Sequence, residues 1–268
     1  ERNIYLRFPN AGIVTLVMTY LLLFGVPGII IIAVQLASMP VFAAGVINGL
    51  GHHSGYRNFE CDDAATNIVP WGLLIGGEEL HNNHHAFPTS AKFSVRKWEF
   101  DIGWFYIRLL SAIGLAKVNR VAPHPVIDDA PDAEPDVDNL KAIIVNRMHV
   151  LRDYTKQVTL PVLRSEKEKA LAKGSRAYRR ARVLLVRRPS LLDDSAQERL
   201  GRLLANNQAL KTVHEFREKL SEIWSGANVS NEKLLQQLRD WCSEAEASGI
   251  EVLEAFAARI RAYQLSPA

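Results

Sequence analysis

The sequence predicts an all-α protein: an integral-membrane helical hairpin with cytosolic histidine-bearing helices, followed by a soluble helical C-terminal region. Three observations support this prediction. Residues 8–55 contain no Asp, Glu, Lys or Arg. Three histidines then fall within positions 81–85, at a spacing that suits one face of a helix. From residue 136 onward the chain is rich in charge and carries repeated helix-start signals.

Charge divides the 268 residues into two unlike halves. Residues 1–135 hold 9 Lys and Arg against 12 Asp and Glu, whereas residues 136–268 hold 23 against 17. This length allows one domain or two. We expect a region over 1–123, a linker rich in proline and acidic residues over 124–135, and a basic helical region over 136–268.

Two further features concern the redox compartment and the start of the sequence. The cysteines, Cys61 and Cys242, form no disulfide framework, so nothing indicates an oxidising compartment. The sequence starts at Glu1 and not at Met, without a signal-peptide pattern, which indicates a fragment of a longer protein.

The uncharged run predicts a membrane hairpin over about 11–50. It is too long for one transmembrane helix of about 20 residues, and Gly25-Val26-Pro27-Gly28 is a turn signal. Arg2 and Arg7 precede the run and favour the cytoplasmic side. Since a hairpin returns the chain to its starting side, the histidines are expected in the cytoplasm too. A buried hairpin of a soluble protein is the alternative. The expected helices lie near 11–24 and 29–50.

The histidines lie in the stretch Gly76-Gly77-Glu78-Glu79-Leu80-His81-Asn82-Asn83-His84-His85. Imidazole is the commonest protein ligand for iron, zinc and copper. His84 and His85 follow His81 by three and four positions, so one helix face can present all three rings. Adjacent histidines point about 100° apart, which suits two metals better than one. A polar surface patch is the alternative.

A second polar pair lies at the expected end of the second membrane helix. Asn48 and His52 are four residues apart and share a helix face. Such groups are costly at a membrane helix end unless they are partnered, so a functional role is the default interpretation.

Together these residues resemble the third histidine box of membrane fatty-acid desaturases, which reads His-Asn-x-His-His after Gly-Glu. Roughly residues 1–123 are similar to the second half of a bacterial Δ9-type acyl-CoA or acyl-lipid desaturase. The resemblance also covers Asn48-Gly49-Leu50-Gly51-His52, Gly55-Tyr56-Arg57, Phe87-Pro88 and Trp98-Glu99-Phe100-Asp101.

The resemblance implies a non-haem centre of two iron ions. It implies that Asn48 contacts the second iron through water and that Glu78 accepts the spare N–H of a ligating histidine. His53 is then a supporting group and not a ligand. No catalytic residue beyond the metal ligands is implied. The implied iron ligands are His52, His81, His84 and His85.

The family uses O₂ as co-substrate, inserts a cis double bond in an acyl chain and reduces O₂ to water. The implied partners are a fatty acyl-CoA or a phospholipid acyl chain, an electron donor such as ferredoxin or a cytochrome-like protein, and membrane lipids. No nucleic acid is expected as a partner. The implied location is the bacterial inner membrane, with the active site facing the cytoplasm.

The family carries three histidine boxes, whereas this sequence has the third box and His52. Four ligands cannot satisfy two irons, so we expect the chain to be inactive alone and the missing boxes to precede Glu1. Two alternatives remain: a related di-iron lipid hydroxylase or ketolase, and a non-catalytic membrane-anchored binding protein.

Two other segments of the first region also carry predictions. Residues 56–67 are polar and acidic and are expected to form a solvated cytosolic loop, with a Ca²⁺ site as a remote alternative. The aromatic residues of 98–115 suit an amphipathic helix at the membrane interface, or an ordinary packed helix.

The C-terminal region predicts helices near 136–160, 165–187, 194–225, 230–247 and 249–263. Ser165, Ser195 and Ser248 each begin a capping-box pattern, and Pro161, Pro189 and Gly226 mark expected breaks. His149 and His214 are isolated and are interpreted as surface or packing residues.

Residues 164–188 hold ten Lys and Arg against two acidic residues. Such a basic helix suits anionic lipid, an acidic electron carrier or nucleic acid, and is most often a solvated face. The last sixty residues also resemble the helical tail of some insertion-sequence transposases. No catalytic acidic triad accompanies that resemblance, so we interpret it as a shared helical module.

Overall fold

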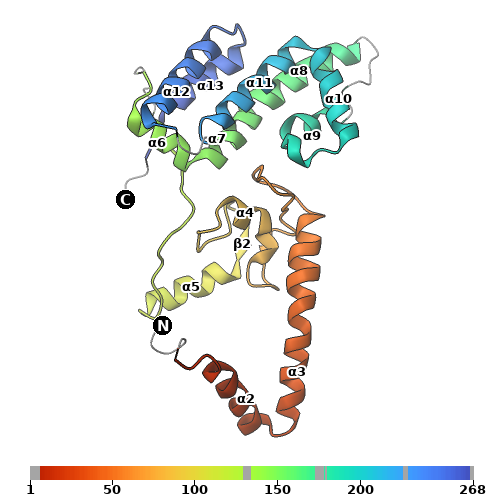
Figure 1. Ribbon diagram of the computed structural model, residues 1–268, viewed down its shortest axis with the longest axis vertical. Helices are drawn as coiled ribbons and strands as arrows, with labels where there is room; N and C mark the ends of the chain where they lie inside the picture. The colour runs from red at the N-terminus through yellow and green to blue at the C-terminus, as the bar shows by residue number, and fades with distance from the viewer. Residues whose placement is uncertain (1–6, 129–133, 173–177, 179, 226–228, 266–268) are drawn as a thin grey trace. The chain divides into compact units, whose positions relative to one another are not determined.

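The computed structural model describes residues 7–128, 134–172, 178, 180–225 and 229–265 (Figure 1). The chain divides into two compact units, Glu1–Ser54 and Gly55–Ala268. Several sequence predictions fall outside the described residues: Arg2 of the lead-in, the middle of the linker, part of the basic helix and the break at Gly226.

The N-terminal unit consists of apolar helices. Helix α2 spans Ala11–Phe24, as predicted, and ends at Gly25, whose φ of 62° suits glycine. Helix α3 spans Pro27–Pro40 and continues through a π-helical segment, Val41–Gly49, and a 3₁₀ turn, Leu50–His52. The amide of Gln35 donates to the hydroxyl of Tyr20 over 2.9 Å.

Within the described residues, one helix is long and apolar enough to cross a membrane. It is the continuous segment Pro27–His52, with 26 residues and a mean hydropathy of 2.2. This finding rests on length and composition. Ala11–Phe24 and Ile102–Ala112 are shorter apolar helices.

The second unit begins with the histidine-bearing segment, residues 55–128, which has little regular structure. It contains a 3₁₀ turn, two helices, a two-stranded parallel sheet, in which Trp71 pairs with Phe100 and Gly72 with Asp101, and a further short strand at 126–127. The all-α prediction is therefore right for most of the chain but missed these short strands. The elements are β1 Trp71–Gly72, the 3₁₀ turn Glu78–Leu80, α4 His81–Ala86, β2 Phe100–Asp101 and α5 Ile102–Ala112.

Helix α5 begins later than the aromatic pattern predicted. Asp101 Oδ1 accepts from the Trp104 amide over 2.8 Å and caps the helix. Trp98 therefore precedes the helix. The same carboxylate accepts from the amide of Phe93 over 2.6 Å, so Asp101 ties the helix start to an earlier loop.

The remainder of the second unit, which we call the helical region, is built from short helices around one apolar core. Four aromatic side chains meet edge to face at its centre, Tyr154, Phe216, Trp241 and Phe256. Figure 1 shows α12 and α13 side by side. The helices are α6 Val137–Val145, α7 Arg147–Tyr154, α8 Leu160–Ala172, α9 Ala181–Val186, α10 Asp194–Ala205, α11 Gln208–Glu222, α12 Asn231–Glu246 and α13 Glu251–Arg261; Thr155–Thr159 is π-helical and Pro189–Leu191 is a 3₁₀ turn.

A second small sheet joins the segment just before the helical region to the end of that region. Strand β3, Val126–Ile127, pairs antiparallel with β4, Tyr263–Gln264. The side-chain amide of Asn139 in α6 donates to the carbonyls of Ile260, Arg261 and Tyr263. Residues at the two ends of the helical region are thus hydrogen-bonded to each other.

Several predicted boundaries in this region were wrong. The chain stays helical through Pro161. The π-helical turn Thr155–Thr159 directly precedes the helix that contains this proline, and a wider turn of this kind leaves space for the proline ring. The expected helix 194–225 breaks at Asn206–Asn207, where the Asn207 side chain caps α11.

The three predicted capping boxes were also wrong. Ser165 lies inside α8, and Ser195 lies inside α10, which Asp193 caps instead. Ser248 accepts from the amide of Ile250, and α13 starts without a side-chain cap. The Ser-x-x-Glu pattern alone therefore does not fix where a helix begins.

Candidate metal centre

Helix α4 presents the three histidines as their spacing predicted. The ring centroids of His81 and His85 are 4.3 Å apart, those of His84 and His85 5.7 Å, and those of His81 and His84 6.2 Å. One ring nitrogen of His81 and one of His85 lie within 4.8 Å of each other. The helix therefore brings donor atoms of His81 and His85 within reach of one metal ion, with the His84 ring beside them.

Carboxylates hold two of these rings. Nδ1 of His81 lies 3.3 Å from Oε2 of Glu78, and Nδ1 of His85 lies 2.6 Å from Oδ2 of Asp63. A carboxylate that accepts from Nδ1–H fixes the tautomer in which Nε2 carries the lone pair. The hydrogen bond with His81 lowers the pKa of Glu78, which keeps this carboxyl ionised.

His84 differs from its two neighbours. Its ring packs against Phe93, with 4.6 Å between centroids. Its Nδ1 is buried and has no hydrogen-bond partner among the residues that the structure describes. Burial lowers the pKa of His84, so the ring is held neutral, which is the form that binds a metal.

These observations fit a metal with nitrogen ligands. Neutral imidazoles suit iron, zinc and copper. Cys61 lies in the same segment, but its sulfur is not part of the donor cluster that includes His81 and His85, and burial raises the pKa of its thiol to about 12. The donor set is therefore imidazole with carboxylate support.

A buried network of amides holds α4 in place, and no sequence pattern predicted it. Asn82 Oδ1 accepts from the amides of Asn58 and Phe59 over 2.8 and 3.0 Å. Asn83 Oδ1 accepts from the side chains of Asn58 and Asn67. The two asparagines between the histidines are thus the fixing points of the helix.

Glu99 closes this network. Its Oε2 accepts from the Asn83 side chain over 2.9 Å, and its Oε1 accepts from Tyr56 over 2.8 Å and from Asn58 over 2.5 Å. Burial raises the pKa of Tyr56, and the bond to Glu99 adds to the shift. The Trp98–Asp101 motif therefore supports the histidine helix through Glu99.

The turn before α4 depends on Glu79 and on Gly77. Glu79 is buried and accepts from the amides of Leu74 and Ile75 over 2.5 and 3.1 Å. Gly77 has a φ of 102°, and a Cβ there would lie 2.7 Å from Oδ1 of Asp101. Glu79 is therefore a structural carboxylate, whereas Glu78 faces the histidines.

The predicted solvated loop 56–67 is largely buried. Phe59, Ala65 and Asn67 are each at most 1% exposed. Arg57 donates to the carbonyls of Asp63 and Ala65, which folds the loop onto itself. The acidic composition suggested solvent, but these polar groups are paired within the loop and with α4.

The remaining candidate residues lie in the N-terminal unit. His52 ends the 3₁₀ turn Leu50–His52 and is partly buried. Nδ1 of His53 lies 2.8 Å from the hydroxyl of Ser54. The Asn48 amide donates to the carbonyl of Ala43 over 2.8 Å.

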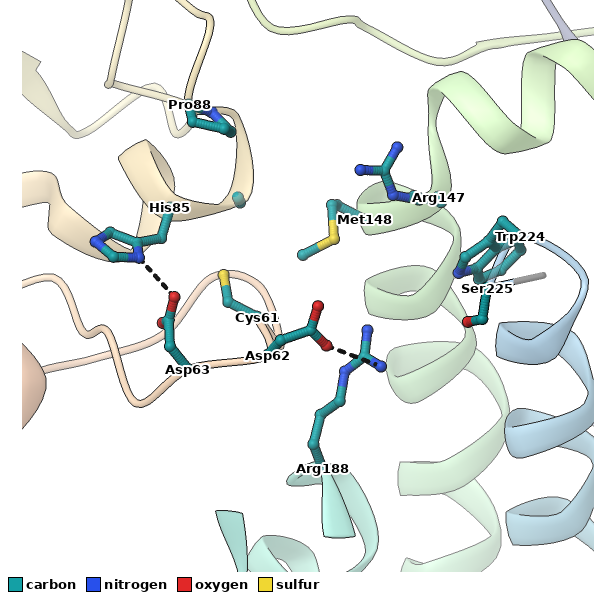
Figure 2. Close-up of a pocket in the computed structure, with 11 residues that line it drawn as sticks. Cys61, Asp62, Asp63, His85, Pro88, Arg147, Met148, Arg188, Trp224 and Ser225 are labelled. Atoms are coloured by element: carbon teal, nitrogen blue, oxygen red, sulfur yellow. Dashed lines mark hydrogen bonds and ion pairs between the residues drawn. The ribbon is translucent and has the colours of Figure 1, made fainter. Parts of the chain in front are cut away.

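A pocket of about 670 Å³ lies beside His85, between loop 61–63 and the helical region (Figure 2). Figure 2 shows Met148 and Arg188 reaching from the helical region toward this loop, where Arg188 pairs with Asp62 over 3.0 Å. Two arginines and two aspartates line the pocket, so its charge is balanced.

Comparison with known proteins relates stretches of 70–80 residues to fatty-acid desaturases. The chain is 44% identical over 71 residues to the sn-2 palmitoyl-lipid 9-desaturase of Nostoc sp. (strain 36), covering 26% of this chain and 25% of that protein. It is 41% identical over 77 residues to the sn-1 stearoyl-lipid 9-desaturase of Anabaena variabilis, covering 29% and 28%. It is 46% identical over 70 residues to the icosanoyl-CoA 5-desaturase of Limnanthes douglasii, covering 26% and 20%.

The predicted resemblance to the desaturase family is confirmed by these relatives. The chain spans about a quarter of the length of the curated relatives that it matches.

A different family matches the C-terminal part of the chain. A transposase family model, DDE_Tnp_ISL3, matches residues 138–266. This match covers most of the helical region, whereas the sequence indicated such a likeness for the last sixty residues alone. No solved structure matches the chain.

Proposed function

We propose that the histidine-bearing segment forms part of the di-iron centre of an O₂-dependent fatty acyl desaturase, which inserts a cis double bond in an acyl-CoA or acyl-lipid chain. The observation that carries the proposal is the imidazole cluster of α4, with two rings oriented by carboxylates. The desaturase relatives supply the reaction class.

The proposed ligands are His52, His81, His84 and His85, with Asn48 acting through water. Glu78 orients His81, and to this expected role we add Asp63, which orients His85. His53 is proposed as a supporting group. Four imidazoles are too few for two iron ions, so the proposed centre needs further ligands beyond those of this segment.

Two iron ions would supply O₂ activation and the oxidant that removes hydrogen from an unactivated methylene. The residues of this chain would hold that centre and supply imidazole ligands that carry no charge. Burial keeps His84 unprotonated, and the asparagine network fixes the helix that carries it. The electrons would come from a ferredoxin or a cytochrome-like protein.

The proposed substrates and location follow from the relatives and from exposed apolar surface. The relatives are named for lipid-linked and CoA-linked acyl chains. Pro27–His52 is apolar and long enough to span a membrane, and we propose the hairpin over about 11–50 as its anchor. The placement in a bacterial inner membrane, with the site toward the cytoplasm, is part of the proposal.

Helix α5, strand β1 and residues next to them add an apolar surface that suits contact with lipid. Their large apolar side chains are exposed although they belong to a folded segment, and an exposed patch of this kind is typical of a membrane or protein contact. The exposed residues are Trp71, Leu74, Trp98, Phe105, Tyr106, Leu109 and Ile113.

Substitution of the histidines tests the proposal. In the full-length protein, His81→Ala or His85→Ala is expected to abolish desaturation and to lower the iron content, because each removes an iron ligand. His124→Ala is the control, since His124 is exposed and lies outside the cluster. Fatty-acid methyl esters, analysed by mass spectrometry, distinguish a new cis double bond from the hydroxylated or oxidised product of a related di-iron enzyme. Full activity and full iron content in both variants would contradict the assignment.

A further inference from the structure

Two phenylalanines connect α4 to the helical region. The Phe87 amide donates to the carbonyls of Asn83 and His84, both over 3.1 Å, and so continues the last turn of α4. The Phe59 amide donates to the Asn82 side chain over 3.0 Å. The two rings contact each other edge to face, with 5.1 Å between centroids.

His149 of α7 lies against both rings. Its imidazole stacks on Phe87 at 5.2 Å with an interplanar angle of 27°, and it meets Phe59 edge-on at 5.2 Å. Its Nε2 donates to the carbonyl of Pro123 over 3.0 Å, and the residue is 2% exposed. We call Phe59, Phe87 and His149 the aromatic clamp.

Neighbouring contacts reinforce the clamp. The Arg152 guanidinium lies over the Phe59 ring, 5.6 Å from its centroid, and Met148 packs against the same apolar cluster. The Arg188–Asp62 pair is a further link, but Asp62 is 85% exposed, and exposed ion pairs contribute little. The aromatic contacts therefore contribute more to the stability of this interface than the ion pair does.

We infer that the helical region positions the histidine helix through the aromatic clamp, and that His149 is the positioning residue. Helix α4 has six residues, far fewer than an isolated helix needs to be stable. Glu79 and the glycine turn fix the start of α4, and the clamp fixes its end, where His84 and His85 lie. The helical region would thus act as a support for the proposed metal centre, which is the part of this inference that rests on the proposed function.

Hydrogen exchange in the full-length, metal-free protein tests the clamp without requiring iron. His149→Ala is expected to speed amide exchange in residues 84–87 at least tenfold. His149→Phe keeps an aromatic ring between Phe59 and Phe87 and should restore slow exchange. Val213→Ala is the control, because Val213 is fully buried in the helical core and is not part of the apolar cluster that contains Phe59 and Phe87. Unchanged exchange in His149→Ala, or equal acceleration in Val213→Ala, would overturn the inference.

A metal titration then tests positioning. With Co²⁺ as the probe, His149→Ala should bind more weakly and shift the visible absorption of the bound ion, while His149→Phe should match the original protein. Faster exchange together with unchanged Co²⁺ affinity would refute the positioning role. Weak Co²⁺ binding by every variant, including the original protein, would count against the proposed metal centre, while the exchange result would still stand for the clamp.

Discussion

Asp63 and Asp62 are neighbours with different surroundings. Asp63 lies 2.6 Å from His85 Nδ1, whereas Asp62 is 85% exposed and faces Arg188. A carboxylate that orients a ligating imidazole typically changes metal affinity by about 10–100-fold when it is removed. From the sequence, both residues are predicted to be acidic side chains of a solvated loop.

Asp63→Asn is therefore expected to weaken iron retention by about 10–100-fold. Competition with a chelator in the full-length protein measures this change. Asp62→Asn is the matched control and should retain iron as the original protein does. An equal loss in both variants would show that the charge of the loop matters and the contact with His85 does not.

The histidines could be assigned from the sequence because a helix brings positions three and four apart together. The residues that hold the histidine helix in place could not be assigned in this way. Asn83 meets Asn58, Asn67 and Glu99, which lie 25, 16 and 16 residues away in the chain. Local spacing contains no information about such contacts, and an asparagine between two histidines gives no sign of burial.

At the scale of elements, regular apolar helices were predictable and their ends were less so. The bounds of α2 follow from composition and from Gly25. Aromatic density predicts a helix from Trp98, but Asp101 caps α5, so the helix begins later, at Ile102. Strands β1 and β2 pair two residues each, which is too short for an alternating pattern to appear.

The exposed aromatic side chains before and within α5 give a prediction about membrane contact. In lipid vesicles, a variant retaining only Trp98 should be strongly quenched by brominated lipid, because this side chain is 57% exposed on the apolar surface. A variant retaining only Trp241, which is 3% exposed in the helical core, is the control and should be quenched little. Equal quenching of the two would argue against lipid contact at this surface.

At the scale of the whole molecule, the second unit joins a desaturase-like segment to a region that matches a transposase model. The helical region could be predicted as helical from charge and periodicity, but its contact with the histidine segment could not. His149 was interpreted as a surface or packing residue, and the structure shows that it packs.

The buried imidazole makes stability depend on pH. Burial lowers the pKa of His149 to about 4, with Arg152 and His124 acting in the same direction and Asp153 and the Pro123 carbonyl opposing them. The unfolded value is about 6.5, so the folded state binds fewer protons between these values. This contribution, about 3 kcal/mol, is fully present above pH ~6.5 and is lost as the pH falls through ~4.

Thermal unfolding between pH 7.5 and pH 4.5 measures this dependence. The original protein should lose stability steeply as the pH falls, and His149→Phe should show a shallower decline because it has no proton to take up. Parallel curves for the two proteins would mean that other groups account for the pH dependence.

The hydrogen bonds from Asn139 to Ile260, Arg261 and Tyr263 have a consequence for synthesis. The first helix of the helical region cannot complete these bonds until the ribosome has made the last one. At roughly 5–20 residues per second, the wait is on the order of 6–25 s. The histidine helix has left the ribosome throughout that time, while the fold that supports it is still unfinished. The segment that carries the proposed metal ligands is therefore outside the ribosome before the helices that support it are complete.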